Sequence, residues 1–218
     1  MNNLIGFIVS VIYIGMILVS SKIFEKTVKE DSRKYIHIML SNLWIIAMIF
    51  FDNWICASIM PFAFIFVNYF SYKSNIIKVM ERDDNDENKD SLGTVYYAIS
   101  LFILAALTFG KINNPAIGLC GIIVMGYGDG LAAVIGQAVK SKEFKVNGNT
   151  KSVAGCLAMF LVTFIVISGY LTYFESSYVL VKSILVAVIM TVIEAVSAKG
   201  TDNLTVPLIT AALMAFLG

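Results

Sequence analysis

Histidine, proline and charged residues are all scarce in this 218-residue chain. A single histidine excludes a metal site built from several imidazole ligands. Only 14% of the residues are charged, against about 25% in soluble domains, which excludes an ordinary soluble globule and a disordered tail. The net charge of +1 gives no field that would attract a polyanion, so no nucleic-acid partner is expected.

Cysteine is rare and widely spaced. Cys56, Cys120 and Cys156 lie far apart in apolar runs and form no CxxC pair, so we interpret them as small buried hydrophobic residues rather than a disulfide framework. The chain also shows no internal repeat of the kind that would indicate an inverted-topology transporter.

Long apolar runs are abundant, with 58% hydrophobic residues and a mean hydropathy of +0.81. A helix needs about 20 apolar residues to cross a bilayer. Eight runs approach this length: 4–21, 36–51, 54–70, 92–109, 115–138, 152–172, 178–197 and 203–217. We predict an all-α, polytopic integral membrane bundle of about eight transmembrane helices, with residues 1–218 as a single transmembrane domain. The last run is short and contains Pro207, so we expect it to be broken, tilted or only partly inserted.

Basic residues mark one side of this bundle. Fourteen of the 16 Lys and Arg residues fall in loops 22–35, 71–91, 139–151 and 198–202. By the positive-inside rule these are cytoplasmic loops, and both termini lie outside. We expect a multi-pass protein of the cell (inner) membrane.

Two carboxylates lie clearly within the apolar runs, Asp129 and Glu194. Ionisable residues inside a membrane are costly and usually functional. Asp129 stands between Gly128 and Gly130, and such small neighbours would let a metal–phosphate group approach the backbone. The alternative is a packing helix whose single Asp bonds to a neighbouring helix.

Most of the remaining reactive side chains fall at the predicted cytoplasmic boundary. They open three of the other helices: Arg33, Lys34 and His37 the second, Lys151 and Ser152 the sixth, Asp202 and Asn203 the eighth. A transporter needs polar groups along a path through the midplane. The observed distribution instead indicates a one-sided site, open to the cytoplasm and to the inner leaflet.

These residue types are suited to phosphoryl transfer. Basic residues at helix starts hold phosphates with the help of free backbone N–H groups, and carboxylates hold Mg²⁺. A nucleotide is the natural phosphate source, and a lipid alcohol the natural acceptor. His37 shares a helix face with Arg33 and Lys34 and would contact a phosphate, act as general base, or make a bundle contact.

Five short motifs occur in an order that is known from one family. They are Arg33-Lys34-Tyr-Ile-His37, Gly93-Thr94-Val-Tyr96-Tyr97, Gly128-Asp129-Gly130-Leu-Ala132-Ala133-Val-Ile-Gly136, Lys151-Ser152-Val-Ala-Gly155 and Asp202-Asn203-Leu-Thr205-Val-Pro207. Over residues 30–210 the chain resembles the dolichol kinase, phytol kinase and CTP-dependent diacylglycerol kinase family, which is distantly similar to phosphatidate cytidylyltransferases. The chain departs from the family pattern at Gln137, Ala154 and Cys156.

The resemblance implies an integral membrane kinase that moves the γ-phosphate of a nucleotide, usually CTP, to the hydroxyl of a polyprenol, phytol-like isoprenoid or diacylglycerol. In this hypothesis Asp129 binds Mg²⁺ with Asp202 or Glu194. The expected catalytic residues are Asp129, Lys151 and His37, and the expected phosphate-binding residues are Arg33, Lys34, Gly128, Gly130, Ser152, Gly155 and Asn203. CDP-lipid synthesis and a non-enzymatic transporter are the alternatives, and the sequence gives no oligomeric state.

Overall fold

The fold is described from a computed structural model, which covers residues 2–28, 32–74, 92–198 and 200–217, without the side chains of residues 24–28, 32, 33 and 74. The elements in chain order are α1 (Asn2–Val28), α2 (Ser32–Ser41), α3 (Leu43–Phe50), α4 (Trp54–Ser74), α5 (Gly93–Ala106), the π-helix η2 (Leu107–Lys111), α6 (Pro115–Ile123), the π-helix η3 (Val124–Asp129), α7 (Gly130–Ala138), β1 (Glu143–Val146), β2 (Asn149–Ser152), α8 (Val153–Tyr173), α9 (Val179–Val196) and α10 (Asp202–Leu217).

Six helices among the described residues are long and apolar enough to cross a membrane, and two shorter apolar helices, Lys34–Phe50 and Asp202–Leu217, accompany them. This confirms the predicted all-α polytopic membrane fold. The helix of residues 202–217 is continuous through Pro207, so the expected break is not present.

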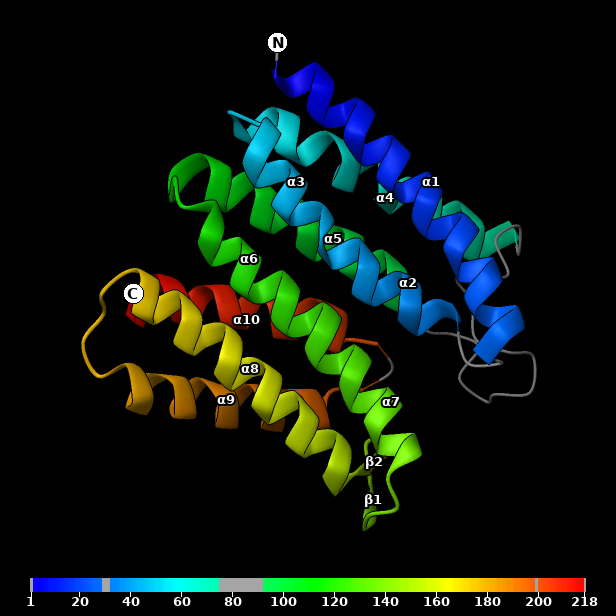
Figure 1. Cartoon of the computed structure of the whole chain (residues 1–218), viewed down its shortest axis with the longest axis vertical. Coiled ribbons are helices and arrows are strands. Elements are labelled where there is room, and N and C mark those ends of the chain that lie inside the picture. Colours follow the sequence, from blue (N-terminus) through cyan, green and yellow to red (C-terminus); the bar gives the residue numbers. More distant parts are fainter. Residues whose placement is uncertain (1, 29–31, 75–91, 199, 218) are drawn as a thin grey trace.

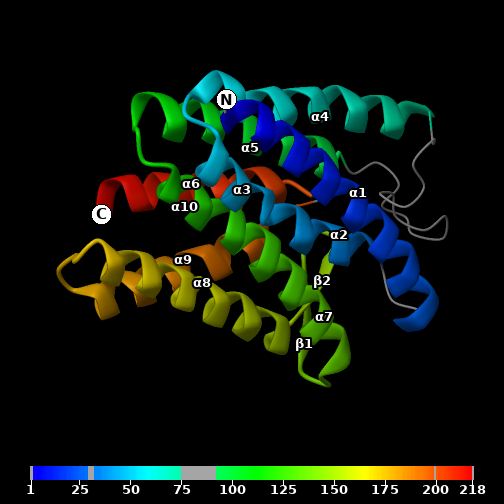
Figure 2. The same ribbon diagram turned by 45° about the horizontal axis from the view of Figure 1, so that its top comes forward.

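The segment Pro115–Ala138, made of α6, η3 and α7, has the largest buried share of these long helices. Figures 1 and 2 show it running through the middle of the bundle, with α2 and α3 along one side and α8 along another. Helix α1 covers α2 and α3, α4 packs along α5, and α10 packs against α5, α6 and α9. Residues from several of these helices therefore meet around the central segment.

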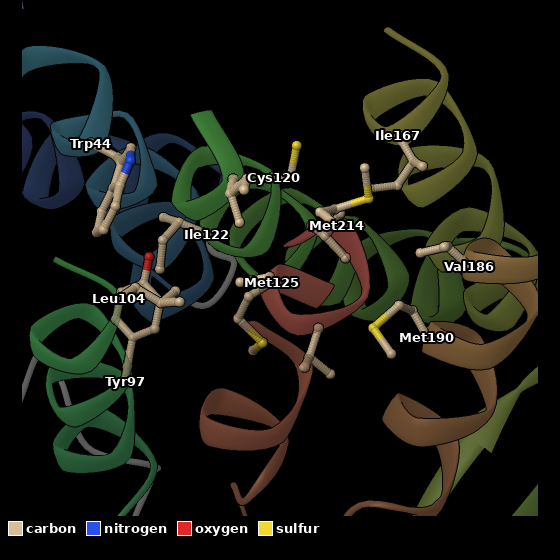
Figure 3. Packing of buried hydrophobic residues seen from close by; sticks show 14 of the residues in the cluster. Trp44, Tyr97, Leu104, Cys120, Ile122, Met125, Ile167, Val186, Met190 and Met214 are labelled. Atoms are coloured by element: carbon tan, nitrogen blue, oxygen red, sulfur yellow. The ribbon is translucent and has the colours of Figure 1, made fainter. Parts of the chain in front are cut away.

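Methionine and branched aliphatic residues fill the centre of the bundle (Figure 3). Ile122, Met125, Met190 and Met214 are fully buried there. Gly121 allows close packing at this point, because a Cβ atom would collide with the backbone carbonyl oxygen of Pro207 on α10. The central helix thus approaches α10 at backbone distance.

The second apolar run differs from the single helix that its composition predicts. It is interrupted at Asn42, between α2 and α3. The Asn42 amide donates to the carbonyl oxygen of Met39 at 3.3 Å, and its side-chain oxygen accepts from the Tyr127 hydroxyl at 3.2 Å. An Asn side chain that bonds nearby backbone competes with helical hydrogen bonds, and here a partner on the central helix stabilises the break.

Two of the predicted loops are partly regular structure. Helix α1 continues to Val28 and α2 starts at Ser32, within the segment expected as loop 22–35. Loop 139–151 contains the antiparallel hairpin β1–β2, and most of loop 71–91 lies outside the described residues. The loop at 198–202 is short, as expected, because α9 ends at Val196 and α10 begins at Asp202.

Successive membrane helices alternate in direction. In Figures 1 and 2 the end of α7, the hairpin, the start of α8, the end of α9 and the starts of α2 and α10 lie at one end of the bundle. Most of the predicted reactive residues lie at or near these helix ends, and Asp129 lies within the central segment, before α7. The fold therefore brings these residues toward the same end of the bundle.

Candidate active site

Asp129 is the last residue of the π-helix η3 in the central segment, and its side chain is mostly buried. Single π-helical turns inside α-helices are rare and often occur at functional sites. The Lys34 ammonium, 95 residues away in sequence on α2, donates to the Asp129 carboxylate at 2.9 Å. The structure therefore brings together two residues that the sequence assigned to the same site.

A second ion pair lies beside the first. Lys151 projects from strand β2, and its ammonium contacts the carboxylate of Glu194 near the end of α9. Glu194 is only 2% exposed, so its charge depends on this partner. Burial disfavours the charged form of Lys151, but the carboxylates of Glu194, Asp129 and Asp202 outweigh it and hold the Lys151 pKa above its ordinary value.

Asp202, at the start of α10, completes a group of three carboxylates. One oxygen from each of Asp129, Glu194 and Asp202 lies within 4.8 Å of the others. Carboxylate oxygens are the ligands that Mg²⁺ prefers, usually with water and substrate phosphate in the remaining positions. Among the described residues this is the group that could hold a metal ion, and it consists of the three residues that the sequence assigned to the metal.

Asn203 follows Asp202, and its side chain is turned toward its own helix start. The amide nitrogen donates to the Gly200 carbonyl oxygen at 3.2 Å and lies 3.4 Å from Asp202 Oδ1. The side-chain oxygen is buried and has no hydrogen-bond partner within the described residues. As placed, Asn203 offers an acceptor, which suits a hydroxyl donor, whereas a phosphate oxygen would require the opposite orientation.

His37 lies one helical turn beyond Lys34 on α2. Its ring packs against the buried ring of Tyr97 on α5, with centroids 4.4 Å apart. The choice between a phosphate contact, a general base and a bundle contact for His37 stays a prediction.

The expectation of free backbone N–H groups is wrong at the start of α8. Val153 donates to the carbonyl oxygen of Lys142 at 3.0 Å, Ala154 to the hydroxyl of Ser141 at 3.1 Å, and Gly155 to the hydroxyl of Ser152 at 3.1 Å. Ser152 is the N-cap of this helix, and local capping therefore uses the donors that were expected to face a phosphate.

The glycines of the predicted phosphate-binding set lie against neighbouring elements. A Cβ atom at Gly128 would meet the sulfur of Met159, and one at Gly130 would meet the side chain of Ile38. At Gly155 it would meet the carbonyl oxygen of Ala132 at 2.7 Å. Close helix packing accounts for all three glycines, and their contact with a phosphate stays a prediction.

Arg33 lies in α2 next to Lys34, but its side chain is outside the described residues. The hairpin that carries Lys151 was not predicted, because residues 139–151 were expected to form a loop. Its signal is the Asn147-Gly148 pair, which occupies the left-handed region with φ of 48° and 81°. This pair is typical of a two-residue hairpin turn.

No family model matches the chain. A phytol kinase from Synechocystis is 32% identical over 212 residues, which cover 94% of this chain and 88% of that protein. The chain belongs to the phytol kinase family. Probable chloroplastic phytol kinases from Glycine max and Zea mays are 28% and 29% identical, and the chain covers 65% and 69% of their lengths. No solved structure matches.

This membership confirms the resemblance seen in the five motifs. In this member of the phytol kinase family, residues from four of the five motifs supply the clustered charges: Lys34, Asp129, Lys151 and Asp202. Glu194 comes from outside the motifs and joins the group through its position at the end of α9. The phytol kinase motifs thus meet in space at one end of the bundle.

Proposed function

We propose that this protein is a lipid-alcohol kinase, which transfers the γ-phosphate of a nucleoside triphosphate to the hydroxyl of a membrane lipid. One observation carries the proposal. In a member of the phytol kinase family, three carboxylates from three helices lie within 4.8 Å of one another, and two lysines from two further elements contact them. Carboxylates and lysines at one membrane boundary are the groups that phosphoryl transfer requires.

The donor set fits Mg²⁺, because all three side chains offer hard oxygen ligands. We propose that Asp129 holds the ion together with Asp202 or Glu194. When bound, Mg²⁺ would neutralise charge on the transferring phosphoryl group.

Lys34 and Lys151 are proposed to bind the phosphates. Their ammonium groups approach from α2 and from β2 and contact two different carboxylates of the group, Asp129 and Glu194. Ser152 and Arg33 belong to the same two elements and are proposed as further phosphate contacts. Fixed positive charges of this kind stabilise the negative charge of the transition state.

The reaction follows the chemistry of in-line phosphoryl transfer. The lipid hydroxyl oxygen forms a bond to the γ-phosphorus, and the bond from that phosphorus to the β,γ-bridging oxygen breaks. The electron pair of this bond leaves with the nucleoside diphosphate. The hydroxyl proton passes to a carboxylate of the site or to His37, and the lipid leaves as its monophosphate.

The finer assignments are CTP as donor, phytol or another isoprenoid alcohol as acceptor, and a site on the cytoplasmic face of the cell membrane. CTP rests on the family resemblance, and phytol on the names of the relatives. The cytoplasmic face rests on the sequence pattern, in which 14 of the 16 basic residues fall in the four predicted loops 22–35, 71–91, 139–151 and 198–202.

Labelled substrates test the proposal. Purified protein in lipid is incubated with Mg²⁺, with γ-labelled CTP, ATP, GTP or UTP, and with phytol, a polyprenol or diacylglycerol. We expect the γ label in phytyl monophosphate, with the highest rate for CTP. Absence of label from every lipid alcohol would refute the kinase function.

Two controls separate the alternatives. Label that enters a phosphatidic acid from the α position of CTP would indicate CDP-lipid synthesis instead. In sealed inside-out vesicles, added nucleotide should support the reaction without detergent, whereas vesicles of the opposite orientation should be inactive. The reverse pattern would place the site on the other face.

A further inference from the structure

The hairpin β1–β2 presents one face to the helices and the other to solvent. Along β2, Asn149 and Lys151 are partly buried, while Thr150 between them is exposed. In the opposite strand their register partners Val146 and Phe144 are also partly buried. Because side chains alternate along a strand, Asn149 and Lys151 project from the same face.

This face docks on the end of helix α9. The side-chain amide of Asn149 donates to the carbonyl oxygen of Ser197 at 3.1 Å, and that of Asn147 donates to the carbonyl oxygen of Val196 at 2.6 Å. Carbonyl groups in the last turn of a helix lack partners within the helix, and the two amides satisfy them. Glu194, one turn earlier on α9, contacts Lys151.

We propose that Asn149 is a positioning residue that holds Lys151 in the site, with Asn147 as a second anchor; this inference rests on the proposed function. Lys151 has a flexible stem, so the place of its ammonium depends on where the strand lies. A two-stranded hairpin is only marginally stable by itself, so its position depends on contacts with the helices. Asn149 supplies one such contact two residues from Lys151.

The base of the hairpin is held separately. Val153 donates to the carbonyl oxygen of Lys142, and Ala154 to the hydroxyl of Ser141, both where α8 begins. Removing the Asn149 amide therefore leaves the hairpin attached to α8, while its contact with α9 is reduced to the Asn147 anchor and the pair of Lys151 and Glu194. We expect a change in the site without loss of the fold.

The test is a double-mutant cycle on the full-length protein, which uses Asn149→Ala, Lys151→Met and the combined variant. The assay uses phytol and whichever of CTP, ATP, GTP and UTP the wild type accepts. Thr150→Ala is the matched control, because Thr150 lies on the same strand with its side chain turned to solvent. Thermal unfolding is measured for every variant.

We expect Asn149→Ala to raise KM for the triphosphate about tenfold with an unchanged melting temperature, while Thr150→Ala behaves as the wild type. In the Lys151→Met background, Asn149→Ala should change KM less than about twofold. The positioning role would be overturned if Asn149→Ala raised KM as much in the Lys151→Met background as in the wild type. It would also be overturned if the loss of activity in Asn149→Ala went together with a lower melting temperature.

Failure of the proposed function gives a different result. A Lys151→Met variant with wild-type kinetics would overturn the phosphate-binding role of Lys151 and, with it, this inference. If Asn149→Ala does not fold, the same cycle is run with Asn147→Ala, which removes the other anchor. We expect Asn147→Ala to raise KM in the wild type but hardly at all in the Lys151→Met background. Equal effects of Asn147→Ala on KM in both backgrounds would overturn the inference.

Discussion

Replacing Asp129 by Asn changes one buried carboxylate to an amide of nearly the same shape. The variant keeps an oxygen that can accept from Lys34, but it loses the negative charge. A neutral amide binds Mg²⁺ much more weakly than a carboxylate does, and the site needs the bound ion to hold the nucleotide phosphates. We expect turnover to fall at least about 1000-fold, equivalent to about 4 kcal/mol of transition-state stabilisation.

The structure also predicts the effect on stability. With an effective dielectric constant of about 20, the pair of Lys34 and Asp129 at 2.9 Å contributes about 6 kcal/mol, and two like charges no more than 4.8 Å apart cost at least about 3.5 kcal/mol. Asparagine loses the attraction and relieves two such repulsions, from Glu194 and Asp202. The effects nearly cancel, so the free energy of unfolding should change by less than about 2 kcal/mol.

The assay follows γ label from the accepted triphosphate into phytol, together with thermal unfolding of the purified protein. Asp52→Asn is the matched control, because Asp52 is an exposed carboxylate in the turn between α3 and α4. We expect this control to keep wild-type turnover. An Asp129→Asn protein that is folded and retains more than about a tenth of wild-type turnover would refute the reasoning.

Three further predictions concern the metal, the charge of Lys151 and the packing of the central helix. Treatment with EDTA should abolish turnover and Mg²⁺ should restore it, whereas full activity after chelation would exclude the proposed metal site. Because neighbouring carboxylates raise the pKa of Lys151, its side chain should stay charged as pH rises to about 9. The kcat/KM of the wild type and of Lys151→Arg should therefore depend on pH in the same way below about pH 9, and a loss of kcat/KM in this range that is present in the wild type and absent in Lys151→Arg would contradict the prediction. Gly121→Ala should destabilise the protein by about 1–3 kcal/mol through collision with Pro207, while Gly15→Ala, which meets nothing within 4 Å, should not; equal melting temperatures for these two variants would contradict the packing.

The membrane fold could be predicted from composition because an apolar run of sufficient length encodes a spanning helix by itself. The break at Asn42 and the π-helix before Asp129 could not, because each depends on tertiary contacts. Asn42 bonds to Tyr127 across the interface, and Gly126 packs directly against Ser41. The sequence of each segment alone therefore does not predict its irregular backbone, because the stabilising contacts come from the other segment.

The residues of the site were more predictable than their detailed contacts. Charge in an apolar helix is conspicuous, so Asp129 and Glu194 could be singled out from the sequence, and Asp202 was expected at the same boundary because it opens a helix. The capping of the backbone N–H groups at the start of α8 was not predicted, because the same Ser152 side chain that was expected to bind phosphate accepts from Gly155 instead. The hairpin turn at Asn147-Gly148 was not predicted although the pair is a turn signal, and its contact with α9 depends on the docking of two distant elements.

We propose that Asp129, with Asp202 or Glu194, holds one metal ion next to the nucleotide phosphates. Pulsed electron paramagnetic resonance of purified protein with Mn²⁺ and CTP tests it directly, because coupling to ³¹P reports phosphate beside the metal. We expect one protein-bound Mn²⁺ with ³¹P coupling in the wild type and none in Asp129→Asn. Bound Mn²⁺ that persists unchanged in Asp129→Asn, or no bound Mn²⁺ in the wild type with nucleotide present, would contradict the claim.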